Sequence, residues 1–159
     1  IDRSKRVRAK IKNRFVSTMA SIVATLPSYN SNECDIVIDR DKKISSKMTM
    51  GIVANGRFLG GGFKAAPRAK FSDGLMDIII LTNSGSFKML DKLIELKGTS
   101  TYKFEDDILY YQASEVKFLP KERNVTVSVD GEPIGILPAI FKSYHNALTI
   151  KSETPSSRI

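Results

Sequence analysis

Apolar residues recur every four positions through the first part of the chain, at Val7, Ile11, Phe15 and Met19. This spacing places them on one face of a helix, and basic residues fill the opposite face. The pattern predicts an amphipathic helix from Ser4 to Leu26, with Ser4 as its N-cap and Pro27 as its stop.

Beyond residue 32 the apolar period changes from four to two, which indicates β-strands. Strands are predicted over 35–39, 48–55, 75–81, 110–119, 125–129, 134–141 and 147–151. In the second of these strands, one face is expected to hold Met48, Met50, Ile52 and Ala54. One further helix is predicted over 87–96, because its apolar residues follow a helical rhythm before Gly98.

The order of these elements favours a mainly β fold. Strands that do not alternate with helices argue against a parallel Rossmann sheet. We therefore predict an antiparallel β-sandwich or open barrel with an N-terminal basic helix and one more helix. A length of 159 residues suits one domain. That domain is expected over 1–151, followed by a polar tail over 152–159.

The positive charge is concentrated at the start of the chain. Residues 1–14 hold seven basic side chains against Asp2, so they carry +6 of the total +8 and leave +2 for the rest. The seven are Arg3, Lys5, Arg6, Arg8, Lys10, Lys12 and Arg14. Such an arm favours an anionic partner: a membrane surface, a nucleic acid or an acidic patch on another domain. A solvated helix face is the alternative interpretation.

Several conventional sites are absent from the sequence. Cys34 is the only cysteine, so no internal disulfide forms and no cysteine cluster can bind zinc. The chain contains neither a phosphate-binding G-x-x-x-x-G-K-[ST] loop nor a G-x-G-x-x-G motif. His145 is the only histidine and lies in a polar turn, which disfavours a catalytic triad. No apolar run approaches the ~20 residues that span a bilayer.

Three segments could carry chemistry, and each also has a plain structural interpretation. Residues 54–63 are rich in glycine, which permits close approach of a ligand but equally suits a kinked strand. Residues 70–77 place Asp73 in a turn that could hold a hard cation through oxygens, or that is an ordinary Asp-Gly turn. Asp130 and Glu132 flank Gly131, as a general base with a neighbouring carboxylate or as a hairpin turn.

These segments occur together in a recognisable frame. The stretches ANGRFLGGGFKAAPRAKFSDGLMDIIIL and VTVSVDGEPIGILPAIFKSYHNALTI resemble the diacylglycerol kinase, sphingosine kinase and ceramide kinase superfamily, in particular its soluble bacterial and archaeal lipid kinases. The resemblance runs from about Ser4 to Lys151. It implies a C-terminal β-sandwich domain whose N-terminal, nucleotide-binding domain carries a GGDGT motif. That motif does not occur in this chain, so we expect a piece of a longer enzyme.

The resemblance also implies roles for individual residues. Asp130 matches the general base that takes the proton from a lipid hydroxyl, and Glu132 matches its neighbouring carboxylate. Asp73 matches a structural magnesium ligand, and the main-chain carbonyls of Lys70 and Leu75 complete the protein ligands. The inter-domain cleft that receives substrate is matched by Asn55, Gly56, Arg57, Gly60, Gly61 and Gly62. ATP, the catalytic magnesium and most of the charge neutralisation would come from the other domain.

The function implied is ATP-dependent phosphorylation of a hydroxyl on a diacylglycerol-like or sphingoid lipid, by a cytoplasmic enzyme peripheral to the membrane. Its partners would be the lipid at a membrane surface and the N-terminal domain of the same protein, with no specific nucleic acid; a homodimer stays open, as does the identity of the lipid. The chain alone is expected to be inactive. One alternative is a non-catalytic basic β-domain that binds an anionic membrane or nucleic acid. Another is a relative of NAD kinase.

Overall fold

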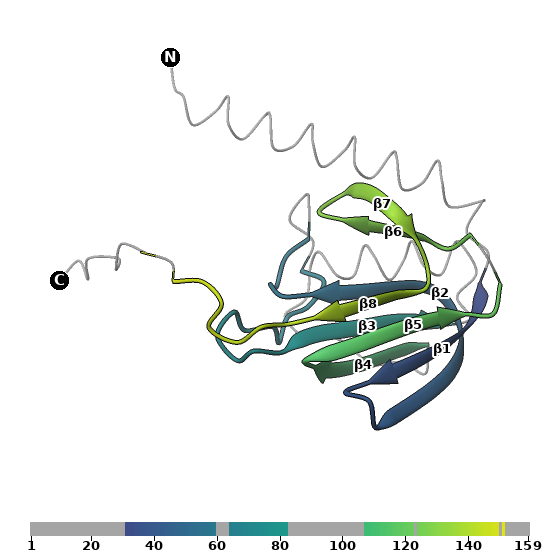
Figure 1. The fold of residues 1–159 in the computed structure, drawn as a ribbon, viewed down its shortest axis with the longest axis horizontal. Coiled ribbons are helices and arrows are strands. Elements are labelled where there is room, and N and C mark those ends of the chain that lie inside the picture. The colour runs from purple at the N-terminus through teal and green to yellow at the C-terminus, as the bar shows by residue number, and fades with distance from the viewer. Residues whose placement is uncertain (1–30, 60–63, 83–106, 123, 150, 152–159) are drawn as a thin grey trace, which may run out of the picture.

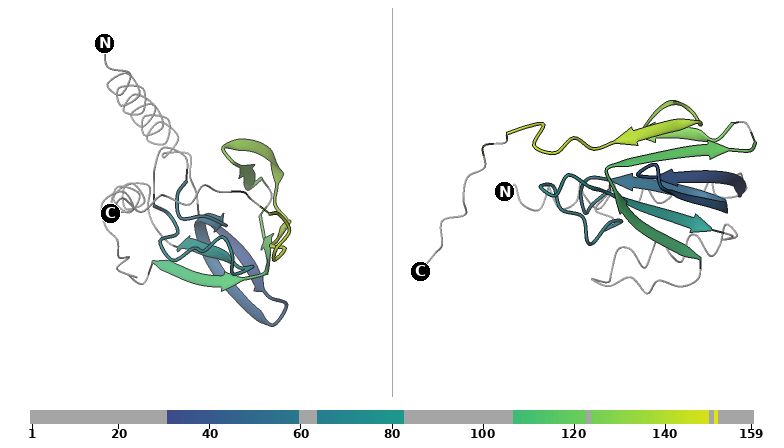
Figure 2. Two further views of the ribbon diagram at one scale, coloured as in Figure 1. Left: turned by 90° about the vertical axis from the view of Figure 1, so that its left-hand side faces the viewer. Right: turned by 60° about the horizontal axis from the view of Figure 1, so that its bottom comes forward.

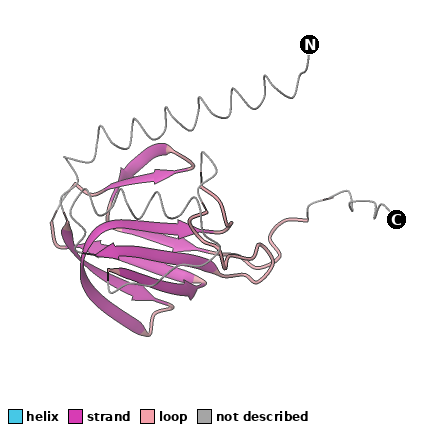
Figure 3. Cartoon of the chain, turned by 180° about the vertical axis from the view of Figure 1, so that it is seen from behind, coloured by secondary structure: helices cyan, strands magenta, loops and turns pink. Residues whose placement is uncertain are grey.

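The computed structural model describes residues 31–59, 64–82, 107–122, 124–149 and 151. Every regular element in these ranges is a β-strand, as Figure 3 shows. The predicted helices over 4–26 and 87–96, and the tail over 152–159, lie outside the described residues. Within the described ranges the structure contains no apolar helix of bilayer-spanning length. The prediction of a mainly antiparallel β fold is confirmed.

In the described part of the chain, eight strands form two antiparallel sheets (Figure 1). In chain order the strands are β1 (Asn32–Ile38), β2 (Lys42–Ala54), β3 (Met76–Thr82), β4 (Ile108–Ala113), β5 (Glu115–Pro120), β6 (Thr126–Val129), β7 (Glu132–Ile136) and β8 (Ala139–Lys142). The larger sheet has six strands in the order β4-β3-β2-β1-β5-β8, and β6 with β7 makes a two-stranded ribbon.

The six-stranded sheet curls because of the short connection between β4 and β5. Only Ser114 separates these strands along the chain, yet three strands lie between them in the sheet. Two residues span no more than about 7 Å, so the sheet must bend until β4 and β5 meet at a corner. The curvature is visible when the molecule is turned on its side (Figure 2). The single strand predicted over 110–119 is therefore wrong, since it is broken at this corner.

The Asp39 side chain fastens the corner. Its Oδ1 accepts hydrogen bonds from the main-chain nitrogens of Ser114 and Glu115 and from the Ser114 hydroxyl, each at 2.9 Å. The main-chain nitrogen of Asp39 also donates to the Glu115 carbonyl at 2.9 Å. The turn between β1 and β2 thus holds β4 and β5 in place.

Two hydrophobic clusters lie on the two faces of the sheet. The inner core is built around Ile36, Ile78, Ile80, Val116 and Phe118, and the β6–β7 ribbon covers it through Val127 and the neighbouring Leu137. The outer core is built around Ile52, Ile79, Leu81 and Ile108, and the segment 64–69 covers it with three alanines. Successive residues of β3 enter alternate clusters, which explains why this strand is apolar throughout.

A β-bulge in β2 changes which residues face each core. The pairing steps from Met48 opposite Thr82 to Met50 opposite Leu81, so Thr49 is the extra residue. Met48 therefore enters the inner core, whereas Met50 and Ile52 pack in the outer core. The prediction that Met48 shares a face with Met50, Ile52 and Ala54 is wrong for this reason.

The last part of the chain also departs from its predicted strands. The strand expected over 134–141 is two strands, β7 and β8, separated by Leu137 and Pro138, which are joined by a cis peptide bond. The strand expected over 147–151 is not formed in residues 147–149. β8 is fastened to β5 where Lys142 Nζ lies 3.0 Å from Oε2 of its cross-strand partner Glu115. This hydrogen bond is the main cause that lowers the pKa of Glu115.

Candidate functional site

The acidic pair lies on the β6–β7 hairpin. Val129 and Glu132 are paired, so Asp130 and Gly131 form a two-residue loop. Both have positive φ, +51° and +90°, as a type I′ turn requires. Asp-Gly suits these positions because aspartate tolerates the left-handed region and glycine pays no steric penalty there. The hairpin turn predicted from Asp-Gly is confirmed.

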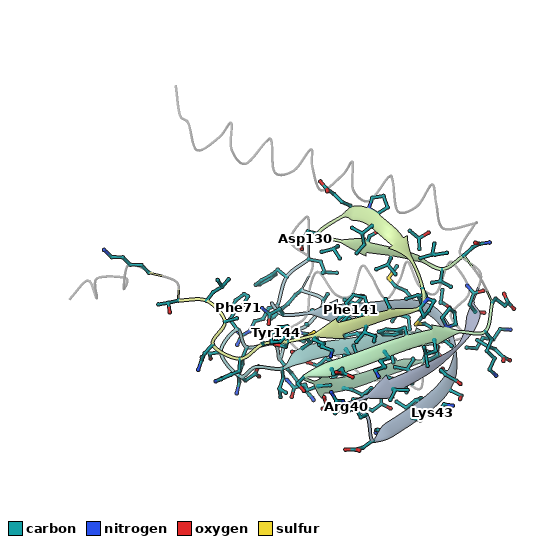
Figure 4. All side chains as sticks on the ribbon, in the orientation of Figure 1. Arg40, Lys43, Phe71, Asp130, Phe141 and Tyr144 are labelled. Carbon is teal, nitrogen blue, oxygen red and sulfur yellow. The ribbon has the colours of Figure 1, made fainter. Side chains whose placement is uncertain are left out.

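Both carboxylates of this pair are exposed. Every residue of β7, including Glu132, is exposed, and a Cβ built on Gly131 would have no described atom within 4 Å. Figure 4 shows Asp130 at the same end of the molecule as Phe71 and Tyr144. Among the described residues no ion pair or hydrogen bond engages the Asp130 carboxylate. With respect to the described residues, the turn therefore presents an unpaired carboxylate at this end.

The glycine-rich segment begins where β2 ends. Asn55 and Arg57 are exposed, whereas Gly56 is half-buried. The Arg57 carbonyl accepts a hydrogen bond from the Ala66 nitrogen at 3.2 Å, and Arg57 Nε donates to the Ala69 carbonyl at 3.1 Å. Arg57 thus holds the two sides of the loop together. The other predicted cleft residues, Gly60, Gly61 and Gly62, lie outside the described residues.

The segment from Lys70 to Leu75 forms a bend against the start of β3. Asp73 Oδ1 accepts a hydrogen bond from the Leu75 nitrogen at 3.0 Å, which closes the turn. Gly74 has φ of +71°, and a Cβ there would lie 2.7 Å from Nδ1 of His145. The bend therefore depends on glycine twice, for its backbone and for the close approach of His145.

The bend and the end of β2 are in direct contact. A Cβ built on Gly56 would lie 2.8 Å from the Phe71 ring, so this aromatic side chain lies over the glycine backbone. The structure thus brings Asn55, Gly56 and Arg57 together with the Asp73 bend. It places the Asp130 turn at the same end of the molecule.

Asp77 was given no role by sequence reasoning. It is 1% exposed, and its Oδ2 has no hydrogen-bond partner among the described residues. Its Oδ1 accepts a long hydrogen bond from Gln112 Nε2 at 3.4 Å. Burial raises the pKa of the Asp77 carboxyl, and the negative charge of Asp73 raises it further. A charged residue inside the apolar run 75–81 was the signal that could have identified it.

The donor set at the bend suits a magnesium ion. Magnesium binds proteins through one or two carboxylates and keeps several waters. Asp73 Oδ1 is used by the Leu75 nitrogen, so Oδ2 is the oxygen left for a cation, and the half-buried position leaves room for waters. In the described part of the chain, no three His, Cys, Asp or Glu side chains gather into a metal-binding group.

The basic arm of residues 3–14 lies outside the described residues, so its expected contact with a membrane or another anion stays a prediction. The possible homodimer also stays a prediction.

Comparison with known proteins identifies relatives of the chain. The family described as the YegS C-terminal NAD kinase beta sandwich-like domain matches residues 3–152. The chain is 31% identical over 101 residues to "Putative lipid kinase YtlR" of Bacillus subtilis (strain 168), covering 64% of the chain and 32% of the relative. It is 34% identical over 82 residues to "Probable lipid kinase YegS-like" of Chromohalobacter salexigens, covering 51% and 25%. The chain thus spans a third or less of these relatives.

Solved structures share the fold. A chain described as a putative diacylglycerol kinase from Bacillus anthracis str. Sterne superposes with a TM-score of 0.63 at 22% identity, covering 77% of this chain and 42% of that one. A chain described as a diacylglycerol kinase from the same organism gives a TM-score of 0.57 at 19% identity, covering 79% and 45%. At these identities the likeness establishes the β architecture.

Proposed function

Because the chain belongs to the family of YegS C-terminal NAD kinase beta sandwich-like domains, within the lipid kinase superfamily, we propose that it is the domain of an ATP-dependent lipid kinase that activates the lipid hydroxyl. The reaction transfers the γ-phosphoryl group of ATP to a lipid hydroxyl. The observation that carries this proposal is the exposed Asp130 carboxylate, held at the tip of a type I′ hairpin that the family match covers.

Asp130 is the general base in this proposal. Its carboxylate accepts the hydroxyl proton as the lipid oxygen bonds to the γ-phosphorus and the bond to the departing ADP oxygen breaks. Such a base must reach the hydroxyl at hydrogen-bond distance, which favours a carboxylate that no other group occupies. The exposed turn meets this requirement, since no described residue engages Asp130. Glu132 follows at the start of β7 and adds negative charge beside the base.

Asp73 is the proposed magnesium ligand, with the main-chain carbonyls of Lys70 and Leu75. A magnesium ion bound there would be structural and would hold the bend, whereas the catalytic magnesium and most of the charge neutralisation would come from the nucleotide-binding domain. The chain fixes where the ion would bind, because the hydrogen bond from the Leu75 nitrogen holds the Asp73 side chain at the bend. Asn55, Gly56 and Arg57 border the same bend and line the path of the substrate.

The nucleotide is proposed to bind outside this chain. The chain lacks the GGDGT motif that the lipid kinases use for ATP, and it spans 32% of the YtlR relative. Catalysis then takes place between this domain and a nucleotide-binding domain, on a protein that meets its lipid at the cytoplasmic membrane surface. Phosphoryl transfer depends mainly on positioning and charge neutralisation, so neither side is expected to be active alone.

A lipid panel tests the proposal. The intact protein is incubated with γ-labelled ATP, magnesium and separate mixed micelles of diacylglycerol, phosphatidylglycerol, sphingosine or an ether lipid. We expect label in the organic phase with at least one of these lipids, and none when the 159-residue chain replaces the intact protein. Failure of all four lipids would contradict lipid kinase activity. Transfer of label by the 159-residue chain alone would contradict the proposal that catalysis needs both domains.

A further inference from the structure

Large apolar side chains are exposed at one end of the molecule. They come from the end of β2, from the bend before β3 and from the segment after β8. Their exposed fractions are Phe58 64%, Leu59 41%, Phe71 80%, Tyr144 74% and Leu148 84%. Figure 4 shows Phe71 and Tyr144 at the same end. Soluble proteins seldom expose adjoining apolar side chains without a partner for them.

Contacts between the three segments make this end one surface. The Phe71 ring lies over the backbone of Gly56, where a Cβ added to the glycine would be only 2.8 Å from the ring. This contact joins the bend to the end of β2. The His145 ring lies against Gly74 and joins the segment after β8 to the same bend. We call residues 55–59, 70–75 and 143–149 the loop surface.

Positive charge predominates in the segments that form or adjoin the loop surface. The described residues of 55–75, 143–149 and 151 contain five cationic side chains and one carboxylate, that of Asp73. The five are Arg57, Lys64, Arg68, Lys70 and Lys151. Cationic side chains beside exposed aromatic and aliphatic tips are the combination that binds the interface of an anionic bilayer. Tyr144 suits the same place, because its ring enters the apolar boundary while its hydroxyl stays hydrated.

We propose that the loop surface docks on an anionic phospholipid bilayer, with Phe71, Tyr144 and Leu148 inserted into the interface and the cations bound to lipid phosphates. The hairpin turn that carries Asp130 lies at the same end of the molecule. Docking in this way brings a lipid headgroup to the end that holds the acidic pair. The docking itself rests on exposure and charge, so it does not require that the proposed kinase reaction be correct.

Flotation tests the docking. The intact protein is mixed with vesicles of phosphatidylcholine containing phosphatidylglycerol and with vesicles of phosphatidylcholine alone. We expect flotation with the anionic vesicles, and partitioning weaker by about tenfold for each of Phe71→Ser and Leu148→Ser. The control is Leu119→Ser, because Leu119 is also exposed, at 41%, but lies outside the loop surface. It is near the end of β5 opposite Glu115, and Glu115 pairs with Lys142, the residue that precedes the loop surface. Equal flotation by all three variants, or none by the parent protein, would overturn the proposal.

A fluorescent label identifies what covers the surface. Leu148→Cys is labelled with a polarity-sensitive thiol reagent in an intact protein whose cysteines outside this chain are replaced by serine. Within the chain the only other cysteine, Cys34, is buried and does not compete. We expect water-like emission in the free protein and a blue shift when anionic vesicles are added. Blue-shifted emission before vesicles are added would show that another part of the protein covers Leu148. A blue shift caused by an oligonucleotide but not by vesicles would show that the loop surface binds nucleic acid and not a bilayer.

Discussion

Two glycines at the candidate site use the left-handed backbone region for different purposes. Gly131 makes the hairpin turn, and a Cβ on it would meet nothing described within 4 Å. Gly74 makes the bend beside Asp73, and a Cβ on it would collide with His145 at 2.7 Å. The two positions therefore share a backbone requirement, and only one of them also needs the space.

This difference predicts unequal costs for the same substitution. Gly131→Ala should lose about 1 kcal/mol of unfolding free energy, the cost of a left-handed backbone alone. Gly74→Ala should lose at least about 2 kcal/mol, since the His145 contact adds to the backbone cost. Urea denaturation of both variants measures the difference. Adding His145→Ala to each should narrow the gap, and a gap that is unchanged would contradict the assigned contact.

The buried Asp77 carboxyl predicts a distinctive pH dependence. Burial raises its pKa in the folded state, so the folded protein holds this proton more tightly than the unfolded chain does. Its contribution to stability is full at low pH and is lost as pH rises through the raised pKa. Asp77→Asn cannot ionise, so we expect its stability relative to the parent protein to increase as pH rises from about 4 to 8.

Asp35 provides the opposite control. Hydrogen bonds from Ser45 and Lys43 lower the pKa of its half-buried carboxyl. Its stabilising contribution is present above the ordinary aspartate pKa and is lost as pH falls through the lowered value. Asp35→Asn should therefore be less stable than the parent protein at neutral pH and approach it in acid. Parallel pH profiles for the two variants would contradict the assigned environment of Asp77.

At the scale of elements, the corner between β4 and β5 sets the shape of the sheet. Asp39 holds this corner with three hydrogen bonds to Ser114 and Glu115. Asp39→Ala should lower the unfolding free energy by about 2–3 kcal/mol, because it removes a charged acceptor and places alanine at a φ of +46°. Asp39→Asn keeps an acceptor oxygen and tolerates this φ, so it should lose less than half as much. If thermal denaturation shows equal losses of stability for Asp39→Ala and Asp39→Asn, the side-chain Oδ1 of residue 39 does not hold the corner.

Sequence patterns predicted the elements whose signal is local. Asp-Gly between alternating residues predicted the hairpin, because the turn type depends on two residues. The bulge at Thr49 and the corner at Ser114 were missed, since apolar alternation continues on both sides of each. Only pairing with β3 reveals the first, and only the position of β5 beside β1 reveals the second. The contact of His145 with Gly74 joins residues distant in sequence and has no local signal.

At the scale of the whole molecule, the curled sheet carries its candidate site at one end. β2 ends at Ala54, just before Asn55. The bend precedes β3, and β8 leads into the segment that contacts Gly74. The β6–β7 ribbon covers the inner core through Val127, which leaves its turn free to present Asp130. The sheet therefore acts as a rigid support for short segments that carry the proposed chemistry.

The central claim is that Asp130 acts as a base and does more than form a turn. Asp130→Asn separates these roles, because asparagine suits the left-handed turn position as well as aspartate does but cannot accept the proton. The decisive measurement is kcat/KM for lipid phosphorylation by the intact protein with and without this substitution, beside their thermal midpoints. We predict at least about a hundredfold loss of kcat/KM with an unchanged midpoint. Full activity in the Asp130→Asn protein would contradict the account.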